Sequence, residues 1–186
     1  MIEVSIQNYK NQLKAKESLF DSYFNNVTSK TILTSSPHSY RHRCEFGIHN
    51  FINCINYSMV KNHKLIEIDK YAICSRAIQS LMKPLLDRIK EDEILLHKLF
   101  QVEFQSSRSQ EVMVSLIYHK NLGPDWIREV KLIKDDLKCS IIGRSKKQKL
   151  IIGQDYVTEE YQSINQSFRL NLYEQCFSQT NPDVCD

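Results

Sequence analysis

Hydrophobic residues recur along this chain with two spacings, and each spacing predicts a different element. A repeat of three to four residues is typical of helices that bury one face, whereas alternation is typical of half-buried strands. The helical repeat covers residues 3–25, 75–90 and 125–138. Alternation or a short apolar run indicates strands at residues 40–48, 64–68, 98–105, 111–119, 139–143 and 149–152, with two further candidates at 167–172 and 174–177.

The order of these elements predicts the fold class. Strand pairs alternate with single helices, and the chain then ends in an extended tail. This order is typical of an α+β domain in which paired strands form a sheet with the helices packed on it. Residues 98–105 and 111–119 are separated by a short polar segment, which predicts a hairpin. Pro84 interrupts the apolar stripe of the second helix and should kink or divide it, and Asn181 followed by Pro182 is typical of a helix start.

The composition excludes some classes of protein. There are 4 glycines among 186 residues, and they stand apart from one another. No Gly-rich phosphate-binding loop can be built from them, which argues against a self-contained nucleotide-binding domain of that kind. The chain has no run of about 18 apolar residues, so we expect no membrane partner. The first residues lack the basic and apolar segments of a signal peptide, so we expect a cytoplasmic location.

The cysteines carry no recognisable motif. Six are spread along the chain without a C-x-x-C pair, and the histidines are not at zinc-finger spacing, so we expect no metal site. An even number of cysteines in a chain of this length without an export signal does not imply disulfides. We therefore expect reduced, mostly buried thiols, none of them marked as a nucleophile.

The charge is unevenly distributed although the net charge is only +3. Residues 131–149 carry seven Lys or Arg against two Asp, whereas residues 154–186 carry six acidic residues against one Arg. The basic block ends in a turn with Arg144 and Lys147, which makes these residues candidates for contact with the phosphates of a nucleic acid. The alternative is a solvated helix face followed by a solvated turn.

Four segments of the chain together resemble one family. They are YRHRCEF at residues 40–46, HKLFQ at 97–101 with VSLIYHK at 114–120, IGR at 142–144 with QDY at 154–156, and FSQTNP at 177–182. In this order and at this spacing they resemble the bacterial tRNA (uracil-5-)-methyltransferases, over nearly the whole chain from about residue 7. Those enzymes make ribothymidine at uridine-54 of the tRNA T-loop and take the methyl group from S-adenosylmethionine.

The resemblance also implies that the two halves of the enzyme have different functions. Members of the family are roughly twice as long, and their second half is a doubly wound methyltransferase domain that carries the catalytic Cys and Glu. We therefore expect residues 1–153 to be an RNA-recognition domain and residues 154–186 to be a segment leading to a catalytic domain that is absent from this chain. No catalytic residue is expected here, and the expected partner is tRNA, bound at its T-loop by a monomer.

The resemblance places RNA contacts on the predicted hairpin. Phe100 corresponds to the phenylalanine of the family that stacks on T-loop nucleotides, and His119 corresponds to a position that contacts the RNA. The alternation taken alone predicts another role for Phe100, as a core residue on the same strand face as Val102 and Phe104. His119 taken alone is an exposed residue at a strand end. From the sequence, both alternatives stay open.

Other candidates lie at the two ends of the resemblance. Arg41, Arg43 and Glu45 share one strand face by alternation, so they could hold a phosphate and accept a hydrogen bond from a base edge. An internal Arg–Glu pair is the alternative. Gly47 stands where the family often has a basic residue, which would weaken one RNA contact. Gln179 matches the family glutamine that contacts the cofactor S-adenosylmethionine, although one glutamine cannot bind it alone.

Three functions are compatible with these observations. The first is a tRNA uracil-C5 methyltransferase that is represented here by its tRNA-binding part. The second is a free-standing tRNA-binding or chaperone module without catalysis. The third is a nonfunctional remnant of such an enzyme.

Overall fold

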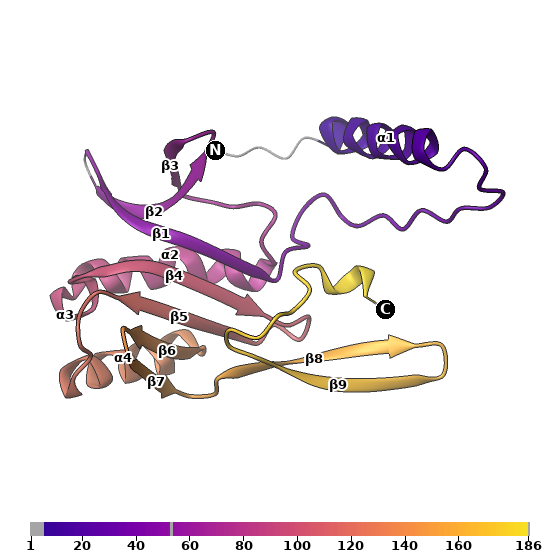
Figure 1. Cartoon of the computed structure of the whole chain (residues 1–186). Coiled ribbons are helices and arrows are strands. Elements are labelled where there is room, and N and C mark those ends of the chain that lie inside the picture. The colour runs from indigo at the N-terminus through magenta and orange to yellow at the C-terminus, as the bar shows by residue number, and fades with distance from the viewer. Residues whose placement is uncertain (1–5, 53, 186) are drawn as a thin grey trace.

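The computed structural model describes residues 6–52 and 54–185, and a seven-stranded mixed sheet forms its centre (Figure 1). The order across the sheet is β3-β2-β1-β4-β5-β6-β7. All neighbours are antiparallel except β5 and β6, which are parallel because helix α4 connects them. The strands are β1 (Arg43–Phe51), β2 (Cys54–Lys61), β3 (Lys64–Ile68), β4 (Leu99–Ser106), β5 (Val112–Tyr118), β6 (Ser140–Ser145) and β7 (Gln148–Ile152).

Helices cover one face of this sheet and form the core with it. Helix α2 (Arg76–Glu91) packs on β4, α4 (Pro124–Leu137) packs on β6 and β7, and the short α3 (Glu93–Leu96) lies between the two. The largest fully buried side chains of this layer include Phe46, Tyr57, Phe104, Tyr118 and Trp126. The predicted α+β class, with paired strands and helices packed on the sheet, is therefore confirmed.

Two further elements lie outside this two-layer body. Helix α1 (Ile6–Tyr23) stands away from the sheet at the end of a long extended segment (Figure 1). Strands β8 (Tyr156–Ser163) and β9 (Gln166–Tyr173) form a separate hairpin, which follows β7 in the chain. It is anchored to the β4–β5 turn, where the Glu159 carboxylate accepts from Arg108 Nε at 2.9 Å. No helix among residues 6–52 and 54–185 is long and apolar enough to cross a membrane.

The helices agree with the sequence pattern more closely than the strands do. Of the two expected effects of Pro84, a kink or a division of the helix, the division is wrong, because α2 runs unbroken through Pro84. Six buried residues on both sides of Pro84 hold the helix against the sheet, and this packing outweighs the one lost backbone hydrogen bond. The last helix start is also present, as a short 3-10 helix η1 (Pro182–Val184) that follows Asn181.

Two strands were missed and one was wrongly expected. Strand β2 alternates from Ile55 to Met59, and this signal was overlooked. Strand β8 has a glutamate, Glu159, at a buried position, which hides its alternation. Both strands are held by pairing, β2 with β1 and β3, and β8 with β9. Residues 174–177 do not form a strand, because the chain turns at Gln175, whose φ is +64°. Such a turn at a non-glycine residue leaves no trace in the hydrophobic pattern.

The expectation for the cysteines is wrong in two respects. Cys44 and Cys74 form a disulfide, and three of the four free cysteines are exposed, whereas Cys139 is buried. The residues of the disulfide lie 30 positions apart. They meet because the segment before α2 runs beside the start of β1, where Arg41 N donates to Ile73 O at 2.8 Å. Burial raises the pKa of the Cys139 thiol to about 11, which leaves it unreactive.

Candidate nucleic-acid interface

A β-bulge decides where Phe100 points. Leu99 pairs with Tyr118 and Gln101 pairs with Ile117, so Phe100 is an extra residue on β4 with no partner of its own on β5. The bulge changes the alternation of the strand. Leu99 takes the place in the core, and Phe100 turns to the open face of the sheet, where it is half-buried. The interpretation that Phe100 shares a core face with Val102 and Phe104 is therefore wrong.

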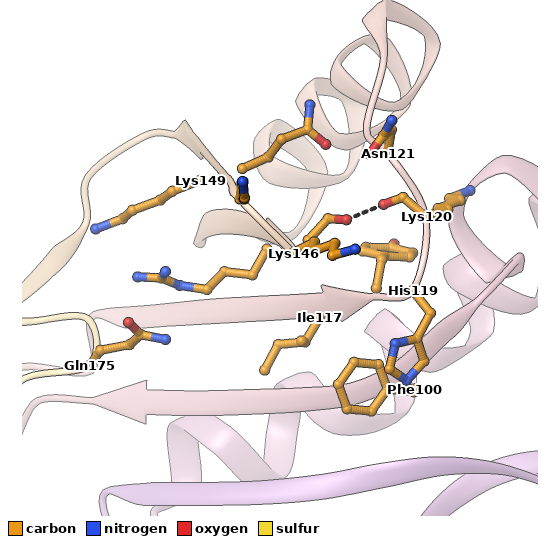
Figure 2. A pocket seen from close by; sticks show the side chains of 13 residues that line it. Phe100, Ile117, His119, Lys120, Asn121, Lys146, Lys149 and Gln175 are labelled. Carbon is orange, nitrogen blue, oxygen red and sulfur yellow. Dashed lines mark hydrogen bonds between the residues drawn. The ribbon is translucent and has the colours of Figure 1, made fainter.

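Phe100 stacks on His119 at the edge of a large open cavity (Figure 2). The ring centroids are 4.0 Å apart, and the ring planes differ by 12°. His119 directly follows β5 and is exposed, and its backbone N donates to Lys98 O at 2.9 Å. The two rings thus present a preformed flat surface to the cavity, and a nucleobase is a ligand that fits such a surface.

The cavity has a volume of about 820 Å³, and its walls are basic. Lys146 and Lys147 form the turn between β6 and β7 and are exposed, and Arg144 and Lys149 line the cavity from the two strands. Gln175 closes the wall on the other side (Figure 2). Aromatic rings on one side and cations on the other suit a splayed nucleotide with its phosphate.

A buried carboxylate organises two of these cations. Glu174 accepts from Arg144 Nε at 2.6 Å and from Arg144 Nη2, and Lys149 Nζ lies 3.4 Å from the same carboxylate. Burial alone would raise the pKa of Glu174, but the hydrogen bonds and charges of Arg144 and Lys149 outweigh it and hold that pKa below its usual value. The hydrogen bonds that Lys149 donates to Asp155 and Glu174 raise the pKa of Lys149, and the hydrogen bonds that Arg144 donates to Glu174 raise the pKa of Arg144, so both cations stay charged.

Arg41, Arg43 and Glu45 do not line this cavity. Arg43 Nη1 donates to Cys176 O at 2.6 Å, and Arg41 Nε donates to Arg43 O at 2.9 Å. Glu45 is exposed and lies directly opposite Glu103 on β4. Within the described part of the chain, neither arginine forms an ion pair with Glu45, so the alternative of an internal Arg–Glu pair is not found. Their role as RNA contacts stays a prediction.

The structure explains why a glycine is present at position 47. It pairs with Ser58 on β2, and a Cβ atom at Gly47 would lie 2.7 Å from Ser58 Oγ. A basic side chain at this position would require Ser58 to move.

Gln179 lies on the exposed segment between β9 and η1. The segment is tied to the residue before β1, because His42 N donates to Thr180 O at 2.7 Å. Asn181 occupies the N-cap position of η1, but its side chain makes no capping bond. A single exposed amide does not enclose a cofactor, so the described residues by themselves do not fit S-adenosylmethionine.

The structure brings four of the predicted residues into one cavity. They are Phe100, His119, Arg144 and Lys147. Sequence reasoning missed Glu174 and Gln175, which were assigned to a strand. The opposite charges of the basic block at residues 131–149 and the acidic segment at 154–186 were the available signal for Glu174, but they did not distinguish it from the other acidic residues.

The chain was compared with known proteins. The family described as tRNA (Uracil-5-)-methyltransferase matches residues 8–186. Two relatives are a tRNA/tmRNA (uracil-C(5))-methyltransferase from Acinetobacter baumannii, 35% identical over 185 residues, and one from Wolinella succinogenes, 38% identical over 183 residues. Each alignment covers 95% of this chain but 51% and 50% of the relative, so the chain spans about half the length of these relatives.

A solved structure shares the fold. The tRNA (uracil-54, C5)-methyltransferase of Pyrococcus abyssi, solved in complex with S-adenosyl-L-homocysteine, matches 94% of this chain and 44% of its own chain. The TM-score is 0.66 at 15% sequence identity, which supports the arrangement of the elements and nothing finer.

Proposed function

The chain belongs to the tRNA (uracil-5-)-methyltransferase family, and from this premise we propose that it is the tRNA-binding part of a uracil-C5 methyltransferase. The proposed reaction of the whole enzyme transfers a methyl group from S-adenosylmethionine to C5 of uridine-54 in the T-loop. The residues described here supply recognition, and the catalytic Cys and Glu belong to a domain beyond residue 186. The alternative of a free-standing chaperone has no observation in its favour.

The cavity beside the Phe100–His119 stack is the observation that supports this proposal. A base inside a tRNA loop is stacked and paired, so an enzyme must open the loop before the base can enter a catalytic pocket. A protein surface that offers an aromatic plane lowers the cost of opening, because a displaced base stacks on it for about 1–3 kcal/mol. Cations across the cavity hold the neighbouring phosphates at the same time.

The second half of the proposal concerns Gln179. This residue and the segment from Gln175 to Asn181 lead away from the cavity wall toward the end of the chain. We propose that the Gln179 amide contacts the cofactor from the junction with the catalytic domain, and that domain encloses the rest of it. We also propose that the enzyme acts as a cytoplasmic monomer.

Binding of a T-arm hairpin to the 186-residue chain tests the function. We expect the chain to bind a hairpin with the T-loop sequence at least tenfold more tightly than a hairpin of the same length and stem with a scrambled loop. Equal affinities would mean that the basic wall attracts any RNA, and the T-loop proposal would then fail. An intact-mass measurement of the native polypeptide from its source tests whether the catalytic domain that the Gln179 contact requires is present. The proposal requires a mass near twice 21.9 kDa.

A further inference from the structure

Glu174 joins three strands at the wall of the cavity. It directly follows β9, and 3% of its side chain is exposed. Its carboxylate accepts two hydrogen bonds from Arg144 on β6 and one from Ser115 Oγ on β5 at 3.2 Å, and Lys149 on β7 approaches within 3.4 Å. A buried carboxylate with this many donors is a fixed part of the structure, unlike a surface ion pair.

This arrangement sets the direction of the Arg144 side chain. Nε and Nη2 donate to Glu174, and Nη1 makes no hydrogen bond to any described residue. The guanidinium group is planar and rigid, so fixing two of its nitrogens also fixes the direction in which the third one donates. Because Arg144 lines the cavity, Nη1 is the donor left for a ligand there.

We propose that Glu174 is a positioning residue, which holds Arg144 so that its Nη1 donates to one phosphate of the bound RNA loop. This inference rests on the proposed function and adds a residue to it. Glu174 itself does not contact the RNA. Glu174 favours RNA binding by orienting Arg144, since an arginine that is already fixed loses less conformational entropy when it binds a phosphate.

The competing explanation is that Glu174 weakens RNA binding. A carboxylate beside a basic wall also reduces the positive potential that attracts RNA. If this were its main effect, removal of the negative charge would tighten RNA binding and make it more salt-dependent. If Glu174 orients Arg144, removal of the charge weakens binding, so the two explanations differ in sign.

The test compares Glu174→Gln with Glu160→Gln, which removes the same charge from an exposed position on β8. The dissociation constant of the T-arm hairpin is measured over a series of KCl concentrations. We expect Glu174→Gln to weaken binding roughly tenfold, as the loss of one oriented hydrogen bond to a charged group does. The slope of log K against log salt should become shallower by about 0.7 to 0.9, while Glu160→Gln leaves the slope unchanged. Unchanged or tighter binding by Glu174→Gln would overturn the proposal.

A double-mutant cycle separates orientation from a general loss of structure. In an Arg144→Ala background, Glu174→Gln should change the affinity little, because no guanidinium is left to orient. A full loss in that background would also overturn the proposal. Should Glu174→Gln fail to fold, Arg144→Lys keeps the charge without the fork and should weaken binding to a similar extent, and an unchanged affinity would count against the proposal. Failure of the unmodified chain to bind the hairpin would instead contradict the proposed function.

Discussion

Phe100 and His119 stack with their ring centroids 4.0 Å apart, although Phe100 lies on β4 and His119 follows β5, and an extra residue has to be inserted in β4 to bring them together. Each ring restricts the rotamers of the other before any ligand arrives. Side chains that are already ordered lose less entropy on binding. The β-bulge at Phe100 is thus the feature that converts a core hairpin into a candidate recognition surface.

Replacement of Phe100 by alanine should affect binding far more than stability. The ring is half-buried on the open face, so we expect Phe100→Ala to lower the free energy of unfolding by no more than about 1 kcal/mol. Loss of a stacking surface should weaken binding of the T-arm hairpin about tenfold or more. Fluorescence-monitored urea unfolding and a binding titration measure the two effects.

Phe104→Ala on the same strand is the matched control. Phe104 has no exposed surface, and its removal should cost about 3–5 kcal/mol. If Phe100→Ala costs as much stability as Phe104→Ala, Phe100 belongs to the core and leaves the candidate site.

The turn between β6 and β7 should contribute to the salt dependence of RNA binding. Log K for the hairpin is expected to fall with log salt at a slope of about −2 to −4 if three or four cations contact phosphates. Lys147→Gln should make this slope shallower by about 0.7 to 0.9. Lys64→Gln, at the opposite edge of the sheet on β3, should leave it unchanged. A slope that does not depend on Lys147 would remove that residue from the interface.

Stability should fall as the pH drops below neutrality, because of His42. Burial lowers the pKa of His42, more than the nearby carboxylates of Glu159 and Asp183 raise it. The unfolded chain therefore takes up a proton near pH 6.5 while the folded chain does not, so acidification favours unfolding from about pH 6.5 down to the folded pKa. Thermal unfolding over this range measures the effect.

A His42→Gln variant is the control for this pH dependence. The amide can still bond to Ser106 Oγ, which lies 3.1 Å from His42 Nδ1, but it does not titrate. The melting temperature of the variant should vary less between about pH 7 and pH 5 than that of the unmodified protein. An equal pH dependence would show that other groups cause it.

The disulfide between Cys44 and Cys74 should stabilise the start of β1. It closes a loop over a sequence separation of 30, for which chain entropy alone gives about 3–4 kcal/mol. Cys44→Ser should lower the free energy of unfolding by about this amount under oxidising conditions, and a thiol reductant should have the same effect on the unmodified protein. Cys54→Ser, which removes an exposed free thiol, is the control. Alkylation of both Cys44 and Cys74 in the untreated protein would show that the bond is not formed.

The sequence by itself determined the parts of the fold that depend on neighbours along the chain. The apolar stripe of α2, the hairpin of β4 and β5 and the helix start at Pro182 all follow from spacings of a few residues, because helix and strand place side chains at fixed local intervals. The resemblance to a family was also visible in the sequence, because each motif that carries it is a short run of neighbouring residues. It also singled out Phe100 and His119 without showing how they meet.

Only the tertiary structure decided which residues meet across the chain. The bulge that turns Phe100 out of the core depends on how β4 pairs with β5, and the bond between Arg144 and Glu174 joins residues 30 positions apart. The disulfide between Cys44 and Cys74 likewise requires two segments to pack together first. Contacts of this kind form when distant segments are packed against a common sheet, and no local period of hydrophobic and polar residues encodes that packing.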